Sequence, residues 1–253
     1  MYTGISIQNE SLNYTRFQFS QFNRVGSAFD NGFVKHLQPL NVRLMNLEYR
    51  GFSLNTLSIY NLLIDDAGSQ ALWETNTYGV YFAGRAGGDF LIDYVFEYAK
   101  QKDAGSNVSD YSADYALYEV QLSYSNVGLK LGREKLGADG VGYFVTPLAS
   151  LHDYQGWSDQ LASNGLGNLP GGLIDDYVGL SFSCSENFEL STIYHDFKSD
   201  DASFGFGDIG TEWGLKAETV INEFTMVAKY ADYRADNYGI DTTRLWLSVG
   251  LSF

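Results

Sequence analysis

Several features are scarce in this chain of 253 residues, and each absence excludes a class of protein. Cys184 is the single cysteine, so the chain has no internal disulfide and no zinc cluster. No run of about eighteen apolar residues occurs, which excludes a membrane-spanning helix. Basic residues number 16 against 31 acidic ones, and the net charge of −15 repels the phosphates of nucleic acids. We therefore expect neither a helical membrane protein nor a nucleic-acid-binding protein.

Aromatic residues and glycine are abundant instead. The chain has 19 Tyr, 17 Phe and 27 Gly, and aromatic side chains make up 16% of it. This aromatic fraction is higher than a soluble domain needs, and it suits the girdles at the two rims of a transmembrane β-barrel. The composition therefore favours a membrane barrel.

The final segment, residues 242–253, alternates between two kinds of side chain. Its apolar set is Leu245, Leu247, Val249, Leu251 and Phe253. The intervening positions hold Arg244, Trp246, Ser248, Gly250 and Ser252. Such alternation over about ten residues is typical of a strand with one face in lipid and the other in a polar lumen. The last strand of a soluble β-sandwich shows the same pattern, so the rest of the chain has to distinguish the two folds.

Alternation and turn residues predict thirteen strands along the chain, and a helical period is conceivable only within residues 146–163. The predicted strands are residues 3–9, 12–25, 41–50, 54–65, 75–86, 89–102, 114–125, 127–136, 174–185, 187–198, 209–221, 223–235 and 242–253.

The connections between these strands alternate between short and long. The short ones are residues 51–53, 86–88, 125–128, 185–187 and 221–223. The long ones are residues 26–40, 66–74, 103–113, 137–173, 199–208 and 235–241. A soluble meander has no reason to keep its long connections at one end, whereas an outer-membrane barrel has short periplasmic turns and long extracellular loops. The sequence therefore predicts an all-β, antiparallel, up-and-down transmembrane β-barrel of about 12–14 strands.

The odd strand count is a difficulty, because bacterial single-chain barrels usually have an even number. It indicates that one strand is miscounted or that amino-terminal strands are missing. The residues after Met1 carry neither the basic nor the apolar region of a secretion signal, so we expect a mature, recombinant or truncated chain.

The same alternation predicts which side chains line the lumen. A mixture of signs is expected there, and cross-strand partners such as Glu218 and Lys229 either neutralise each other or form a selectivity lining. The candidate pore-lining residues are Arg16, Arg85, Asp93, Glu97, Glu119, Lys130, Glu189, Glu212, Lys216, Lys229 and Arg244.

The connection of residues 137–173 is too long to be a simple loop. Its surroundings contain the motifs Gly132-Arg-Glu-Lys-Leu136, Thr146-Pro-Leu-Ala-Ser-Leu-His152, Gln155-Gly-Trp157 and Gly172-Leu-Ile-Asp-Asp-Tyr177. These motifs resemble the alginate-export family of bacterial outer-membrane porins, whose barrels have more strands than are counted here. The resemblance implies the carboxyl-terminal part of such a porin or a shortened relative. It also implies passive, selective passage of an anionic polysaccharide or a related small solute.

We expect residues 137–173 to fold into or over the lumen. Two roles are open for Tyr154 and Trp157, stacking on the faces of sugars and packing of a loop folded into the barrel, and the second is favoured. The candidate constriction residues are Thr146, Pro147, His152, Tyr154, Gln155 and Trp157.

Catalytic alternatives find little support in the sequence. His195 and Asp196 are adjacent on a strand and point to opposite faces, so they cannot form one dyad. The sequence does not define a catalytic partner for His152-Asp153 or for the acid pairs Asp65-Asp66 and Asp175-Asp176. No spacing of metal ligands occurs. We expect no enzyme, no cofactor and no metal.

Together these observations predict one outer-membrane domain over residues 1–253, a porin for small hydrophilic or anionic solutes such as sugar acids or oligosaccharides. Its expected partners are the lipid bilayer, lipopolysaccharide and, through the terminal strand ending at Phe253, the outer-membrane assembly machinery. That last partner rests on resemblance to the terminal signal of outer-membrane proteins. The alternatives are a truncated or engineered barrel without native transport, and a soluble β-sandwich binding domain.

Overall fold

A computed structural model of the chain describes residues 2–26, 37–66, 71–146, 154–161, 169–203 and 205–251. Apart from one short 3-10 helix, η1 (Ala71–Trp73), its regular elements are strands. They are β1 (Tyr2–Asn9), β2 (Thr15–Gly26), β3 (Leu37–Tyr49), β4 (Asn55–Asp66), β5 (Thr75–Gly87), β6 (Phe90–Asp103), β7 (Ser112–Tyr124), β8 (Val127–Leu136), β9 (Leu173–Ser185), β10 (Phe188–Lys198), β11 (Asp208–Ile221), β12 (Phe224–Ala235) and β13 (Thr242–Leu251). None of the described residues forms a helix long and apolar enough to cross a membrane.

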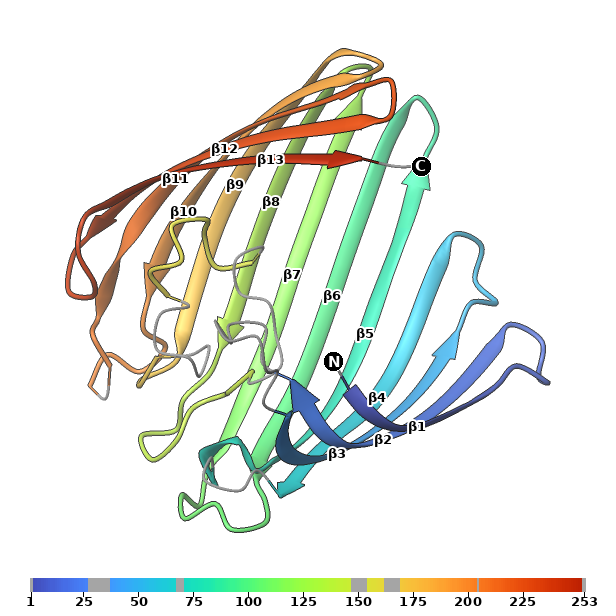
Figure 1. Ribbon diagram of the computed structural model, residues 1–253, viewed down its shortest axis with the longest axis vertical. Helices are drawn as coiled ribbons and strands as arrows, with labels where there is room; N and C mark the ends of the chain where they lie inside the picture. The colour runs from blue at the N-terminus through green and yellow to red at the C-terminus, as the bar shows by residue number, and fades with distance from the viewer. Residues whose placement is uncertain are drawn as a thin grey trace.

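The thirteen strands form a single antiparallel sheet in which each strand pairs with its sequence neighbours, from β1 to β13 (Figure 1). The predicted strand number and strand positions are therefore confirmed, including the odd count. The alternative of a two-sheet sandwich is wrong, because a single continuous ladder runs through all thirteen strands. Short turns lie at one end of the strands and long connections at the other, as predicted.

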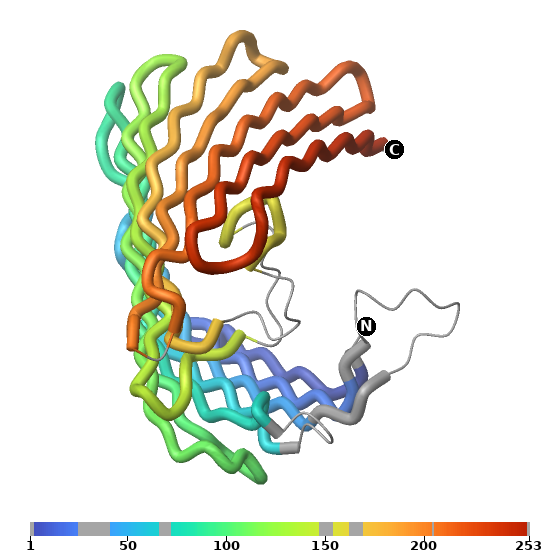
Figure 2. The backbone as a smooth tube through the Cα atoms, turned by 90° about the vertical axis from the view of Figure 1, so that its left-hand side faces the viewer, coloured from blue at the N-terminus to red at the C-terminus, as the bar shows by residue number. Residues whose placement is uncertain are grey.

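The sheet curves strongly, but it does not close into a complete barrel in the described residues (Figure 2). There β1 pairs with β2 and β13 pairs with β12, and these two edge strands do not meet. Strands β1 and β13 run in the same direction because an even number of antiparallel steps separates them. An antiparallel closure between them therefore requires an odd number of further strands.

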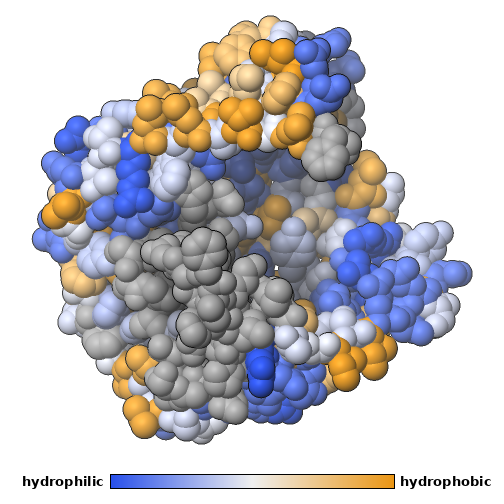
Figure 3. Space-filling view, viewed as in Figure 1, coloured by the Kyte–Doolittle hydropathy of each residue, from blue (hydrophilic) through white to orange (hydrophobic). Residues whose placement is uncertain are grey.

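The two faces of the sheet differ in chemistry. The convex face exposes large apolar and aromatic side chains, among them Tyr98 (46%), Tyr118 (52%) and Leu215 (52%). A soluble protein would bury such a continuous band, whereas lipid is a suitable neighbour for it. The concave face is hollowed, and apolar residues gather over the upper end of the strands, where the short turns lie (Figure 3).

A small hydrophobic core lies on the concave face, toward the end of the sheet with the long connections. Buried residues of strands β6–β12 pack there with buried residues of the β6–β7 and β8–β9 connections. The core comprises Ala99, Tyr111, Ala113, Leu136, Phe144, Leu161, Leu169, Leu173, Phe197, Ile209 and Tyr233.

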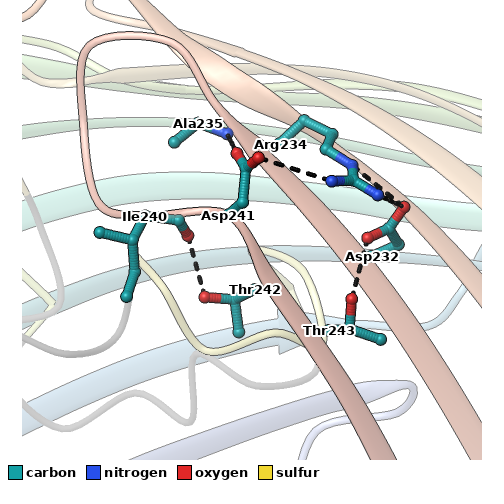
Figure 4. A network of polar contacts seen from close by, with 7 residues as sticks. All are labelled: Asp232, Arg234, Ala235, Ile240, Asp241, Thr242 and Thr243. Atoms are coloured by element: carbon teal, nitrogen blue, oxygen red, sulfur yellow. Dashed lines mark hydrogen bonds and ion pairs between the residues drawn. The ribbon is translucent and has the colours of Figure 1, made fainter.

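The connection between β12 and β13 is fixed by polar contacts (Figure 4). The backbone N–H of Ala235 donates to Asp241 Oδ1 at 2.9 Å, which closes the loop at its base. Arg234 forms ion pairs with Asp232 (2.9 Å) and Asp241 (3.5 Å). Thr243 Oγ1 donates to Asp232 Oδ1 at 3.1 Å, across the β12–β13 ladder. These contacts fix the point at which the last strand begins.

Glycines on the concave face make room for tyrosine rings from the neighbouring strand. A Cβ atom at Gly132 would lie 2.1 Å from Tyr177 Cζ, and one at Gly79 would lie 2.3 Å from Tyr60 Cζ. The hydroxyl groups of both tyrosines reach carboxylates, since Tyr60 donates to Glu97 and Tyr177 donates to Glu119. The absence of a side chain at the glycine is therefore what allows each tyrosine to reach its acceptor.

We predict that Gly132→Ala destabilises the folded protein by about 1–3 kcal/mol, because the added methyl group displaces the Tyr177 ring from its contact with Glu119. Unfolding by denaturant in detergent micelles measures this change. Gly179→Ala is the matched control on the same face, because its Cβ would meet its nearest atom at 3.4 Å. Equal stability of the two variants would contradict the proposed packing.

Candidate functional site

The candidate site is the concave face of the sheet together with the segment 154–161, which lies inside the curve (Figure 2). The strand registers place all eleven predicted pore-lining residues on the same face. Arg85 pairs directly with Asp93, for example, and Lys216 pairs directly with Lys229. Whether these residues line a pore stays a prediction.

One predicted pairing is corrected by the register. Lys229 lies directly opposite Lys216 and not opposite Glu218, whose direct partner is Val227. Glu218 instead forms an ion pair with Lys216 on its own strand at 2.5 Å. Two lysines therefore face each other across β11 and β12, and one of them is paired with a carboxylate of its own strand.

Carboxylates dominate the neighbouring part of the wall, on β6–β9, where tyrosines donate to several of them. Besides the Tyr60–Glu97 and Tyr177–Glu119 contacts, Tyr115 donates to Glu134 at 2.9 Å. Glu119 also forms an ion pair with Lys130 at 3.1 Å. Hydrogen bonds of this kind fix the position of a carboxylate.

Sequence reasoning missed a buried pair formed by His195 and Asp175. His195 Nδ1 lies 2.9 Å from both carboxylate oxygens, and the two side chains are 6% and 0% exposed. The His195 ring stacks on Phe197, with centroids 5.3 Å apart. The tight turn between β9 and β10 carried a usable signal, because it sets His195 opposite Tyr177 and therefore diagonal to Asp175.

The segment 154–161 is held against β11–β13 by its backbone and by its side chains. Glu212, which is 1% exposed, accepts hydrogen bonds from the backbone N–H groups of Trp157 (2.5 Å) and Ser158 (3.1 Å). Trp246 Nε1 donates to the carbonyl oxygen of Trp157 at 3.0 Å. Asp159 accepts from Arg244 at 2.7 Å.

The Trp157 ring packs closely against β11 at Gly214, where a side chain would collide with it. A Cβ atom at Gly214 would lie 2.9 Å from the ring atoms Cε3 and Cζ3 of Trp157. Lys229 Nζ lies 5.1 Å from the centroid of the same ring, within the range of a cation–π interaction. The indole therefore covers the wall of β11 and lies beside one of the two facing lysines.

The other predicted constriction residues have different environments. Tyr154 is 62% exposed, Gln155 is buried at 4%, and Thr146 is half-buried. Pro147 and His152 lie outside the described residues, as does Phe253. The constriction itself stays a prediction.

A cavity of about 420 Å³ opens between the segment 154–161 and the inner wall of β7–β11. Aromatic side chains and charges of both signs share its surface, a combination suited to polar solutes that have an apolar face. Its lining includes Glu119, Lys130, Tyr154, Trp157, Tyr177 and His195.

Among the described residues, no group of three or more histidine, cysteine, aspartate or glutamate side chains is arranged to hold a metal ion.

We predict that Glu212→Ala releases the segment 154–161, because the buried N–H groups of Trp157 and Ser158 lose their acceptor. Amide hydrogen exchange at these two residues should accelerate about tenfold or more. Glu218→Ala is the matched control, since Glu218 lies on the same face and strand and contacts Lys216. Unchanged protection in Glu212→Ala would show that the segment is held by other contacts.

No family model matches this chain, and no curated protein matches it. Solved structures do match. The Pseudomonas aeruginosa protein OccD3 (OpdP) is 14% identical with a TM-score of 0.73, and the alignment covers 98% of this chain and 67% of OccD3. OccK1 (OpdK) of the same organism is 13% identical with a TM-score of 0.71, covering 98% of this chain and 68% of OccK1. Acinetobacter baumannii OccAB4 is 14% identical with a TM-score of 0.72, covering 98% and 64% respectively.

The chain thus spans about two thirds of the length of these proteins. One further match is described as the outer membrane protein OpdK. At these identities the likeness shows the fold, which is that of outer-membrane β-barrel porins. The resemblance to the alginate-export family in particular is not supported by any of these matches.

Proposed function

We propose that the chain forms the wall of an outer-membrane channel for the passive diffusion of small hydrophilic or anionic solutes. The observation that carries this proposal is the set of contacts that hold residues 154–161 on the charged inner wall, through Glu212, Arg244 and Trp246. A segment held inside a curved, polar-lined sheet narrows the passage without closing it.

The two faces of the sheet support this proposal. Exposed apolar side chains cover most of the convex face, and charged side chains lie along the concave face, which is the arrangement of a water-filled pore in a bilayer. In the proposed orientation the short turns are periplasmic and the long connections are extracellular. Lipopolysaccharide would surround the extracellular rim, and the assembly machinery would recognise the terminal strand.

The proposed solute is a small molecule with an anionic group, such as a sugar acid or a short acidic oligosaccharide. Lys216 and Lys229 face each other beside Trp157. An anion near them meets an aromatic surface and two ammonium groups, one of which is shared with Glu218. The carboxylates of β6–β9 lie on the neighbouring part of the wall, where tyrosines donate to Glu97, Glu119 and Glu134.

We predict that Trp157→Ala raises the single-channel conductance in planar bilayers, because removal of the indole widens the passage beside β11. Deletion of residues 146–161 should raise the conductance further. Trp213→Ala is the matched control, because Trp213 is 54% exposed on the convex face and packs on Tyr194. An unchanged conductance in both inner variants would place the segment outside the permeation path.

We predict that Lys216→Gln combined with Lys229→Gln lowers the ratio of chloride to potassium permeability about twofold at 0.1 M salt, where screening leaves charges within about 10 Å effective. The reversal potential under a KCl gradient measures this ratio. Lys100→Gln provides the control, because Lys100 is paired with Asp114 on the convex face. An unchanged permeability ratio in the double variant would show that these lysines do not determine the ion selectivity of the channel.

A further inference from the structure

The convex face of β8–β10 is charged at one end only. Near the long connections, the register sets Arg133 beside Asp176, and Asp176 beside Asp196, on three successive strands. Toward the short turns, the same outward positions hold apolar residues such as Leu129, Leu180 and Leu190. The outer surface of these strands is therefore divided along its length into a charged end and an apolar end.

The charged end consists of exposed and partly exposed ion pairs, which we name the outer ion-pair belt. Its members are Arg133, Lys135, Asp176, Asp196, Lys198 and Asp200. Arg133 contacts Asp176 through Nε (2.6 Å) and Nη2 (2.7 Å), and Lys198 Nζ contacts Asp196 at 2.7 Å. The Arg133 and Lys198 side chains are still 57% and 45% exposed. Both cations therefore keep part of their surface open, where an incoming anion can share their donors.

The apolar end contains a groove of about 660 Å³ on the convex face of β8–β13. The floor of the groove is formed by two small side chains, because Ala217 and Ala228 lie directly opposite each other on β11 and β12. Larger side chains surround this pair of alanines, and they include Phe182, Leu190, Leu215 and Leu245. The groove is long and apolar, which suits a hydrocarbon chain.

The belt and the groove are connected along the same strands. Asp176 is four residues from Leu180 on β9, which is about 13 Å at the rise of a strand. Between the two regions lie the rings of Tyr194 and Trp213, with centroids 4.9 Å apart. Charged groups, aromatic rings and an apolar groove thus follow one another as the headgroup, the interface and the acyl region of a lipid do.

We propose that the belt and the groove together form a docking site for a phosphorylated glycolipid of the outer leaflet. Arg133 and Lys198 bind its phosphates, and one acyl chain lies over Ala217 and Ala228. The proposal rests on the proposed function in two respects: the convex face meets the bilayer, and the long connections are external.

A headgroup with two phosphates fits this site better than one with a single phosphate. Arg133 lies on β8 and Lys198 lies on β10, two strand spacings apart and offset by two residues along the strands, so their backbone positions are about 12 Å apart. Two sugar-borne phosphates can engage both cations, whereas the single phosphate of a phospholipid engages one. The belt also lies at the end with the long connections, which is the external side in the proposed orientation.

Binding of defined lipids to the full chain in detergent micelles, measured by native mass spectrometry, tests this proposal. The probes are bisphosphorylated lipid A, the same lipid after removal of both phosphates, and phosphatidylglycerol. Arg133→Gln and Lys198→Gln should each weaken binding of bisphosphorylated lipid A about tenfold, because each removes charged hydrogen bonds. Lys102→Gln is the matched control. Lys102 lies on the convex face of β6, at the end with the long connections, and it is not a member of the belt.

A second variant tests the groove independently of charge. Ala217→Phe fills the groove, and it should also weaken binding of bisphosphorylated lipid A about tenfold. Phosphatidylglycerol or dephosphorylated lipid bound as tightly as lipid A would overturn the assignment of a phosphorylated glycolipid. Affinities unchanged in Arg133→Gln, Lys198→Gln and Ala217→Phe would overturn the site itself.

Conductance recorded from the same preparations separates this proposal from the channel function. The belt and groove variants should leave conductance unchanged, since all three residues lie on the convex face. Selective lipid binding by a protein without conductance would refute the channel alone. Conductance without lipid selectivity would refute the docking site alone.

Discussion

The two-residue alternation of one continuous antiparallel ladder is the constraint on which the rest of this structure depends. From β4 to β9 and again from β11 to β13, the register has no bulge. A slip by one residue would turn Lys216 outward and Leu215 inward, and it would do the same to every residue of that strand. The division into an apolar convex face and a charged concave face therefore follows from register alone.

Carboxylates on the concave face serve mainly as fixed acceptors. Glu212 accepts from the backbone of residues 157 and 158, and Asp175 contacts a buried imidazole. Glu97, Glu119 and Glu134 each accept from a tyrosine. These five acidic residues thus hold the wall and the inner segment in place. The field that a solute meets depends on these pairings as much as on the net charge.

Much of the fold was predictable from the sequence, because alternation and tight turns are local signals. Turns such as that around Asn222, whose φ of 54° asparagine tolerates, set the boundaries of β11 and β12. The pairing of Lys216 with Lys229 was missed because it depends on the exact register of that turn. The Asp175–His195 pair and the contact of Glu212 with the inner segment join residues that are 20 or more positions apart. The contact of Glu212 depends on the curvature of the sheet, which no local pattern encodes, whereas the Asp175–His195 pair follows from the register of the β9–β10 hairpin.

The common direction of β1 and β13 also restricts the symmetry of any assembly of this chain. A rotation axis along the membrane normal would bring β13 of one copy against β1 of the next in a parallel ladder, unlike the twelve antiparallel ladders within the sheet. A two-fold axis in the membrane plane would pair the edges antiparallel, but it would place the long connections of the two copies on opposite sides of the bilayer. Identical copies inserted with one orientation therefore cannot complete this wall with the hydrogen-bonding pattern that the sheet itself uses.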